Sequence, residues 1–196
     1  MLSNAYARFA AVFAVAGTIT LTTAHAAGEH VAPAMDFAKA NISQWAANSH
    51  LIKAIQAQNV RHSVLTQSQI ENLDRQWRAE VGADHRPLIE EILGRPVSIF
   101  LASIKKQHHG TVMEVFVMDN RGLNVAQSDV TSDYWQGDEA KFKKTYPAGP
   151  DAVFVDEVEM DESTQTFQSQ VSMSIKDPAT NAVIGAITVG LNVDAL

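Results

Sequence analysis

The chain has 196 residues, with 15 Lys and Arg against 22 Asp and Glu, so its formal net charge is −7. Hydrophobic residues make up 46% of the sequence, a share typical of globular domains, which excludes wholesale disorder. Cysteine is absent, and this excludes disulfide scaffolds, thiolate metal sites and cysteine nucleophiles. The acid excess argues against a nucleic-acid-binding protein, because such proteins usually carry a basic face. One domain is expected at this length.

The first 26 residues have the features of a secretory signal peptide. Arg8 is the only charged residue before Glu29, an apolar run covers residues 9–24, and Ala24-His25-Ala26 matches a cleavage site. The run is shorter than the roughly 20 residues that a membrane-spanning helix needs, although an uncleaved anchor is the alternative. We expect cleavage after Ala26, a periplasmic location, and one mature domain over residues 27–196. Without Arg8, 14 basic and 22 acidic residues give that domain a net charge of −8.

The first half of the mature chain is predicted to be helical. Apolar residues at spacings of three and four predict one long amphipathic helix over residues 33–60. Thr66 and Gln69 form a capping box at the start of a second helix. Two shorter helices are expected to begin at Pro87 and Pro96, because proline is favoured in the first turn of a helix.

From Thr111 onward the hydrophobic pattern has a period of two, which predicts strands. Apolar and polar residues alternate most regularly over residues 167–175, as is typical of an antiparallel sheet covered by helix on one face. The predicted fold class is α+β, with the long N-terminal helix and a helical insert packed on a five-stranded antiparallel sheet. The expected strands are residues 111–118, 123–126, 153–160, 167–175 and 183–193.

This order of elements resembles the extracytoplasmic Cache sensor domains, which are relatives of the PAS fold. The resemblance rests on the hairpin at residues 117–122, the loop TSDYWQGDE at 131–139 and the closing IGAITVG at 184–190. It covers roughly residues 33–194 and implies a stand-alone sensor domain that binds a small metabolite between the 131–146 loop and the sheet. Cache domains usually signal to a membrane helix. No such helix follows in this sequence, so a separate membrane-bound signalling partner is expected.

Residues 133–139 combine two aromatic side chains, an amide and three carboxylates. Pockets for small polar ligands use such a mixture, and a carboxylate beside an aromatic face suits an ammonium group. The expected ligand is a small polar metabolite, namely an amine, an amino acid or a carboxylate. Alternatively, the aromatic residues pack the loop onto the core and the acids are solvated. The candidate ligand-binding residues in the loop are Asp133, Tyr134, Trp135 and Gln136.

A second group of five acidic residues lies between Asp156 and Glu162. Oxygen-rich clusters bind Ca²⁺ or Mg²⁺, but side chains alternate between the two faces of a strand, so these five do not all converge. A solvated edge strand is the other interpretation. The resemblance places Asp161 and Ser163 at a corner near the binding loop. Gln170, on the polar face of the next strand, completes the candidate ligand site.

No complete enzyme motif is present in the sequence. Ser103 and Lys106 match an S-x-x-K pattern, but its companion motifs are missing. We therefore expect no catalysis, no cofactor and no metal, and predict a periplasmic domain that binds a small molecule and signals through a separate partner. The alternatives are a ligand-free interaction domain that acts through its long helix, which also suits a homodimer, and divalent-cation binding at the acidic strand.

Overall fold

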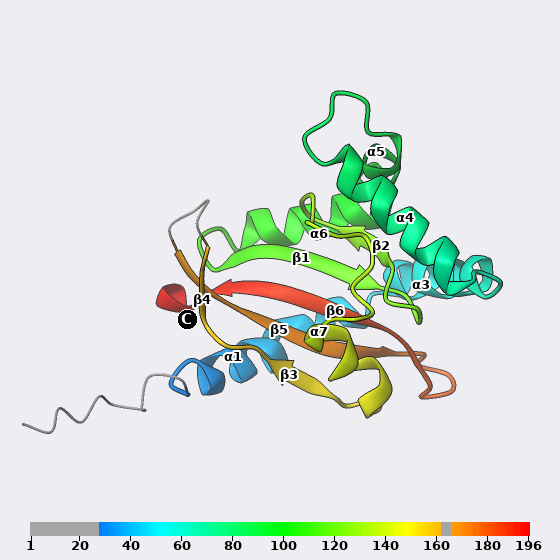
Figure 1. Ribbon diagram of the computed structural model, residues 1–196. Helices are drawn as coiled ribbons and strands as arrows, with labels where there is room; N and C mark the ends of the chain where they lie inside the picture. The colour runs from blue at the N-terminus through cyan, green and yellow to red at the C-terminus, as the bar shows by residue number, and fades with distance from the viewer. Residues whose placement is uncertain (1–27, 162–165) are drawn as a thin grey trace, which may run out of the picture.

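The computed structural model describes residues 28–161 and 166–196 of the chain (Figure 1). These residues form an α+β fold, which confirms the predicted fold class. The antiparallel sheet has the strand order β2-β1-β6-β5-β3, and β4 also pairs with β5. Among the described residues, no helix is long and apolar enough to cross a membrane. The predicted signal peptide, residues 1–26, lies outside the described residues and stays a prediction.

Helices dominate the first half of the described chain, and strands dominate the second. The helical elements are α1 (Val31–Phe37), the π-helical η1 (Ala38–Ile42), α2 (Ser43–Ala46), α3 (Ser49–His62), α4 (Gln67–Glu80), α5 (Pro87–Leu93), α6 (Pro96–Gln107), α7 (Ala140–Lys143) and the short 3-10 helices η2 (Tyr146–Ala148) and η3 (Val193–Ala195). The strands are β1 (Val112–Met118), β2 (Asn124–Gln127), β3 (Val153–Val155), β4 (Glu159–Asp161), β5 (Thr166–Lys176) and β6 (Val183–Asn192).

The prediction of one uninterrupted helix over residues 33–60 is wrong. The helical path of α1, η1 and α2 ends at Ala46, and α3 begins afresh after Asn48. Asn48 has an extended backbone, with φ −62° and ψ 123°, and its side-chain oxygen accepts hydrogen bonds from the backbone N–H groups of His50 and Leu51. Asparagine is among the best residues for this capping role. The apolar spacing continues across the break and therefore hides it.

The other helix starts are confirmed. The Thr66 side chain accepts a hydrogen bond from the Gln69 N–H and the Gln69 side chain accepts one from the Thr66 N–H, which completes the capping box of α4. Pro87 and Pro96 occupy the first turns of α5 and α6. Proline suits this position because its missing N–H has no partner within the helix there.

The five predicted strands are present, but the third one, over residues 153–160, is divided into β3 and β4, so the sheet has six strands. At the division, the carbonyl of Asp156 accepts hydrogen bonds from two side chains, Ser169 Oγ at 2.8 Å and His30 Nε2 at 3.0 Å. The strand ladder resumes where Glu159 pairs with Gln168. Side chains therefore hold the chain at the point where the regular pairing is interrupted.

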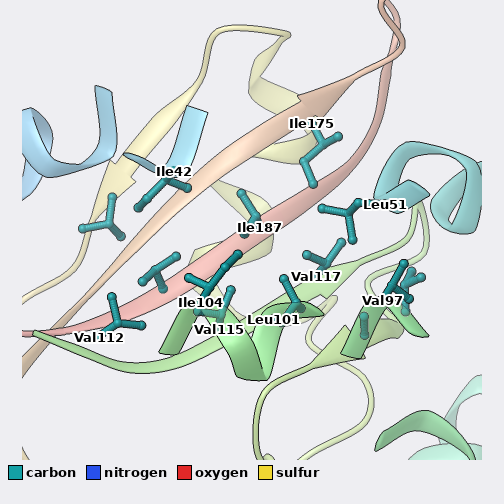
Figure 2. Packing of buried hydrophobic residues seen from close by; sticks show 14 of the residues in the cluster. Ile42, Leu51, Val97, Leu101, Ile104, Val112, Val115, Val117, Ile175 and Ile187 are labelled. Atoms are coloured by element: carbon teal, nitrogen blue, oxygen red, sulfur yellow. The ribbon is translucent and has the colours of Figure 1, made fainter. Parts of the chain in front are cut away.

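The two faces of the sheet have different coverings. One face packs against α3 and α6 through buried residues such as Val115, Val117 and Ile187, which meet Leu51 and Leu101 (Figure 2). Burying an aliphatic side chain of this size stabilises a fold by about 1.5–3 kcal/mol. The segment with α7 and η2 covers one end of the opposite face (Figure 1), where the apolar cluster consists of Phe116, Met118, Phe142 and Ala186 with Tyr146 packed against it.

A β-bulge in β1 decides which side chains reach this second face. The register against β6 shifts between Val112 and Glu114, so Val112 packs into the same core as Val115. Without the bulge, Val112 and Glu114 would share a face, because side chains alternate along a strand. With it, Glu114 lies on the face that α7 covers, beside Phe116.

Candidate functional site

A cavity of about 440 Å³ lies on the α7 face of the sheet, beside the cluster around Phe116. Its walls come from β1, from β4 and β5, and from the segment that leads into α7. The cavity therefore lies between part of the 131–146 loop and the sheet. The lining residues are Glu114, Glu139, Lys141, Asp156, Glu157, Glu159, Met160, Gln168 and Gln170.

Glu114 and Gln170 meet across β6. The Gln170 Nε2 donates a hydrogen bond of 2.8 Å to Glu114 Oε1. Both residues pair in register with Gly190, which lies between them in the sheet. A Cβ atom on Gly190 would lie only 2.8 Å from Glu114 Cγ and 3.3 Å from its Oε1. The missing side chain of Gly190 therefore leaves the space in which the other two side chains meet.

The charges that the described residues bring to the cavity are unbalanced, because five carboxylates face a single ammonium group. That group, Lys141 Nζ, forms an ion pair of 2.8 Å with Glu139 and lies 5.4 Å from the centroid of the Phe116 ring. Within the described part of the chain, no ion pair neutralises the remaining four, which are Glu114, Asp156, Glu157 and Glu159. A low-dielectric cleft lined by one sign of charge concentrates the opposite charge.

Burial makes Glu114 the most unusual of these acids. Loss of solvation raises the pKa of its carboxyl group, and this outweighs the opposite effects of the Gln170 hydrogen bond and the nearby Lys141. A carboxylate accepts hydrogen bonds at about four lone-pair positions. A donor or a cation placed in the cavity would stabilise its charged form.

Asp156 connects the wall of the cavity to the start of the helical half. Its backbone N–H donates to the Gln170 carbonyl at 2.8 Å, and its own side chain accepts a hydrogen bond from the Glu157 N–H. The hydrogen bond from His30 to its carbonyl joins this segment to the residue that precedes α1. The Asp156 carbonyl therefore links the cavity wall to the residue that precedes α1.

The predicted aromatic residues of the loop pack against α4. Tyr134 is buried and stacks on Trp77 with 5.4 Å between the ring centroids, and burial raises the pKa of its hydroxyl group. The backbone N–H groups of Tyr134 and Trp135 donate to Asp74 Oδ1 at 2.9 and 3.0 Å. Trp135 Nε1 donates to the Arg121 carbonyl at 2.8 Å. These contacts hold the loop against the helical insert.

The two polar candidates of the loop, Asp133 and Gln136, also bond to other residues of the protein. Asp133 forms an ion pair of 2.6 Å with Arg78, and Gln136 Nε2 donates a hydrogen bond of 2.9 Å to the Asp133 carbonyl. The structure therefore holds Asp133, Tyr134 and Trp135 against α4. The Gln136 carbonyl accepts a hydrogen bond of 3.1 Å from the N–H of Glu139, which lines the cavity, but none of the four candidates is itself a lining residue. Their role as ligand contacts stays a prediction.

Gln170 is the predicted site residue that lines the cavity. Asp161 is the last residue of β4, but its side chain lies outside the described residues, as does all of Ser163. Sequence reasoning missed Glu114, although one signal was present. It is the only charged residue in the apolar run 111–118, where an ordinary buried strand has none.

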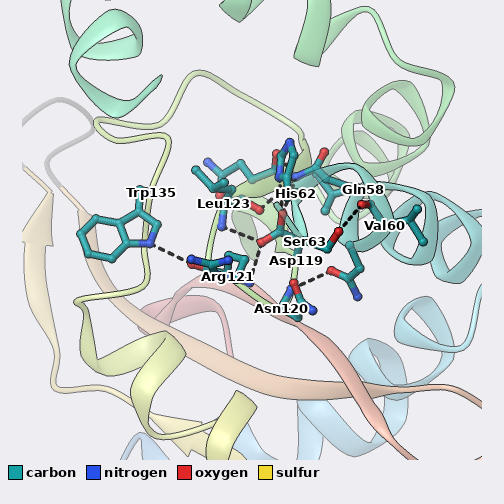
Figure 3. A network of polar contacts seen from close by, with 12 residues as sticks. Gln58, Val60, His62, Ser63, Asp119, Asn120, Arg121, Leu123 and Trp135 are labelled. Atoms are coloured by element: carbon teal, nitrogen blue, oxygen red, sulfur yellow. Dashed lines mark hydrogen bonds and ion pairs between the residues drawn. The ribbon is translucent and has the colours of Figure 1, made fainter. Parts of the chain in front are cut away.

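A separate polar network surrounds Asp119 at the turn between β1 and β2 (Figure 3). Its buried carboxylate accepts hydrogen bonds from the backbone N–H groups of Arg121 and Leu123, from Gln58 Nε2 at 3.0 Å and from His62 Nδ1 at 2.7 Å. Four donors satisfy this acid. The network ties the turn to α3 and lies outside the cavity.

The described residues contain no group of three or more His, Cys, Asp or Glu side chains placed to hold a metal ion. This statement covers only part of the acidic stretch 156–162, because Glu162 lies outside the described residues. The cavity acids Asp156, Glu157 and Glu159 surround an open space and do not form a coordination shell.

No family model and no curated protein matches the sequence. Solved structures do match. The sensor domain of the V. cholerae histidine kinase DctB has 11% sequence identity and a TM-score of 0.49, covering 85% of this chain and 52% of that one. The sensory domain of the Campylobacter jejuni chemoreceptor Tlp3 with isoleucine bound has 14% identity and a TM-score of 0.38, covering 81% of this chain and 62% of that one.

The ligand-binding domain of the Pseudomonas fluorescens chemoreceptor CtaA, in complex with L-serine, has 12% identity and a TM-score of 0.37, covering 63% of this chain and 48% of that one. This chain thus spans less than two thirds of the length of each of these three domains. Identities and TM-scores this low say nothing about the ligand of this chain. The matched structures are sensor and ligand-binding domains of histidine kinases and chemoreceptors.

Proposed function

We propose that the protein is a non-catalytic domain of the sensor type, which binds a small polar molecule in the cavity between residues 139–141 and the sheet. The observation that carries this proposal is the pair of Glu114 and Gln170, hydrogen-bonded to each other at the wall of a cavity of about 440 Å³. Cavities for small molecules usually measure about 300–1,000 Å³ and contain a few placed polar groups.

The energetics of Glu114 support binding as the reason for the cavity. A buried polar group that lacks hydrogen-bond partners costs about 1–3 kcal/mol, and a charged group costs more. The neighbouring positions on the same face, such as Phe116 and Met118, show that this face of β1 also accepts apolar residues. The partly buried carboxylate at position 114 is therefore better stabilised in its charged form when a ligand in the cavity donates to it.

The connection through Asp156 supports a sensor role. The Asp156 carbonyl accepts a hydrogen bond from His30, and the Asp156 N–H donates one to Gln170. A ligand that contacts Asp156 or Gln170 would therefore change how the start of α1 is held. We propose that a separate membrane-bound protein reads this change, and that the protein is exported to the periplasm after cleavage at Ala26. Asp133, Tyr134, Trp135 and Gln136 support the loop that leads to Glu139, and direct contacts from them, Asp161 or Ser163 remain a prediction.

The alternative of a ligand-free interaction domain stays a prediction, but the surface it would use is formed by separate helices, because the helical path is broken between α2 and α3. A homodimer through the surface of α1 to α3 stays a prediction. Divalent-cation binding at residues 156–162 also stays one, and it would be detected as a melting temperature that falls when a chelator is added.

A thermal-shift screen of polar metabolites tests the proposed function. A ligand at 100 times its dissociation constant stabilises the folded protein by about 2.7 kcal/mol, which corresponds to a rise of several degrees. Gln170→Leu should abolish this rise, whereas Gln67→Leu, the same change at an exposed position of α4, should leave it intact. The proposal fails if no compound in the screen stabilises the protein and native mass spectrometry finds none that co-purifies with it.

A further inference from the structure

We infer that the ligand of this cavity carries a positively charged amine, and that Glu114 is the residue that selects it. This inference rests on the proposed function, because it names the chemical class of the molecule that the cavity binds. It narrows the three ligand classes that the sequence left open to those with an ammonium group.

The first argument is the distribution of charge. Among the described residues, Lys141 is the only cation that lines the cavity, and it is already paired with Glu139 and lies against the Phe116 ring. An anionic ligand would have to break this ion pair and then lie among the remaining carboxylates. A cationic ligand meets carboxylates that have no ion-pair partner among the described residues, such as Glu114 and Glu159.

The second argument is the hydrogen bonding of Glu114. Among the described residues, its carboxylate accepts one hydrogen bond, from the amide of Gln170. An ammonium group has up to three N–H donors and a positive charge, so it supplies both things that a buried carboxylate lacks. The Gln170 amide oxygen accepts no hydrogen bond from the rest of the described chain, so it can accept a further N–H. The pair therefore presents two acceptor groups to one amine.

The third argument is the space above β6. Because Gly190 has no side chain, Glu114 and Gln170 reach each other across the strand, and an added Cβ would collide with Glu114. Gly190→Ala therefore pushes the Glu114 carboxylate out of its position without changing any charge. This substitution separates the placement of the carboxylate from its mere presence.

The test compares three four-carbon ligands of different charge by isothermal titration calorimetry on the purified protein. Putrescine carries two positive charges, γ-aminobutyrate carries one of each sign, and succinate carries two negative charges. We expect putrescine to bind most tightly, γ-aminobutyrate about tenfold more weakly, and succinate not at all, because each added carboxylate meets the acidic wall.

Glu114→Gln should weaken putrescine binding by about 10–100-fold, because it replaces a charge-assisted hydrogen bond by a neutral one. Glu71→Gln, the same change on the exposed surface of α4, is the matched control and should leave the affinity unchanged. Glu159→Gln, at the exposed rim, should cost only about two- to fivefold. If the Glu114→Gln protein does not fold, the Glu159→Gln variant still tests whether the acidic wall contributes to binding.

Two results would overturn the inference while the proposed function stands. One is an anionic or uncharged metabolite that stabilises the protein when amines do not. The other is putrescine binding of unchanged affinity in the Glu114→Gln and Glu159→Gln variants. If no compound of any charge binds, the proposed function fails as well.

Discussion

Asp119 and Glu114 are two acids in or beside the same strand, the first fully buried and the second partly buried, and they differ in how many hydrogen bonds the fold donates to them. Asp119 accepts hydrogen bonds from four donors on α3 and on its own turn, so its charge is fully compensated within the fold. Glu114 accepts one, from Gln170, and faces a cavity. A carboxylate that the fold supplies with donors needs no further partner, whereas one that the fold leaves short of donors has lone pairs free for water or for the proposed ligand.

The largest expected effect tests the first half of this comparison. Asp119→Ala leaves two side-chain donors and two backbone N–H groups without an acceptor, so we expect a loss of about 3–5 kcal/mol in the free energy of unfolding. Urea denaturation measures it. Asp36→Ala, at a side chain that is 81% exposed, is the control and should change the value by less than about 0.5 kcal/mol. A loss below about 1 kcal/mol for Asp119→Ala would contradict the structural role.

A smaller effect is expected at Asp74, which holds the loop to α4. Asp74→Ala removes the acceptor of the Tyr134 and Trp135 N–H groups, and the free energy of unfolding should fall by about 1–3 kcal/mol. Hydrogen exchange of these two amides should accelerate as well. Asp84→Ala, at an exposed position before α5, should alter neither quantity. Unchanged amide exchange in Asp74→Ala would show that stacking on Trp77 alone positions the loop.

The smallest expected effect tests the second half of the comparison, through the pH dependence of stability. Burial raises the pKa of Glu114 above the 4.5 of an ordinary glutamate, so the folded state holds this proton more tightly than the unfolded state does. The extra free energy of unfolding that results is fully present below the pKa of the unfolded state. It is lost as the pH rises through the higher pKa of Glu114 in the folded state.

Glu114→Gln cannot ionise and keeps an oxygen for the Gln170 amide. Relative to the parent protein, its free energy of unfolding should therefore increase between about pH 4 and about pH 7, as urea denaturation at both values would show. Glu71→Gln should give no such trend. A variant whose stability relative to the parent falls with rising pH would mean that Glu114 is already compensated, as Asp119 is.

The elements that local chemistry specifies were predictable from the sequence. The capping box of Thr66 and Gln69 and the proline starts at Pro87 and Pro96 each depend on residues close together in the chain, and all are confirmed. The break at Asn48 was missed because the apolar spacing continues on both sides of it, so periodicity outweighed a capping residue that was present in the sequence.

The candidate site was only partly predictable, because long-range pairing assembles it. Gln170 could be found from the alternation along its own strand. Glu114 could not, since the bulge after Val112 sets its face and only the register with β6 places Gly190 between it and Gln170. Residues 133–136 have the composition of a ligand pocket. In the structure, however, the loop instead donates a hydrogen bond to Asp74 and stacks on Trp77, both in α4.

Gly190 also has an evolutionary consequence. Positions 114 and 190 compete for one volume, so a descendant that gains a side chain at 190 must either move the carboxylate of Glu114 or replace this residue by a smaller one. The two positions are expected to change together among homologues. A lineage in which the glycine is replaced while the glutamate persists would have moved that carboxylate elsewhere, and with it the specificity of the cavity.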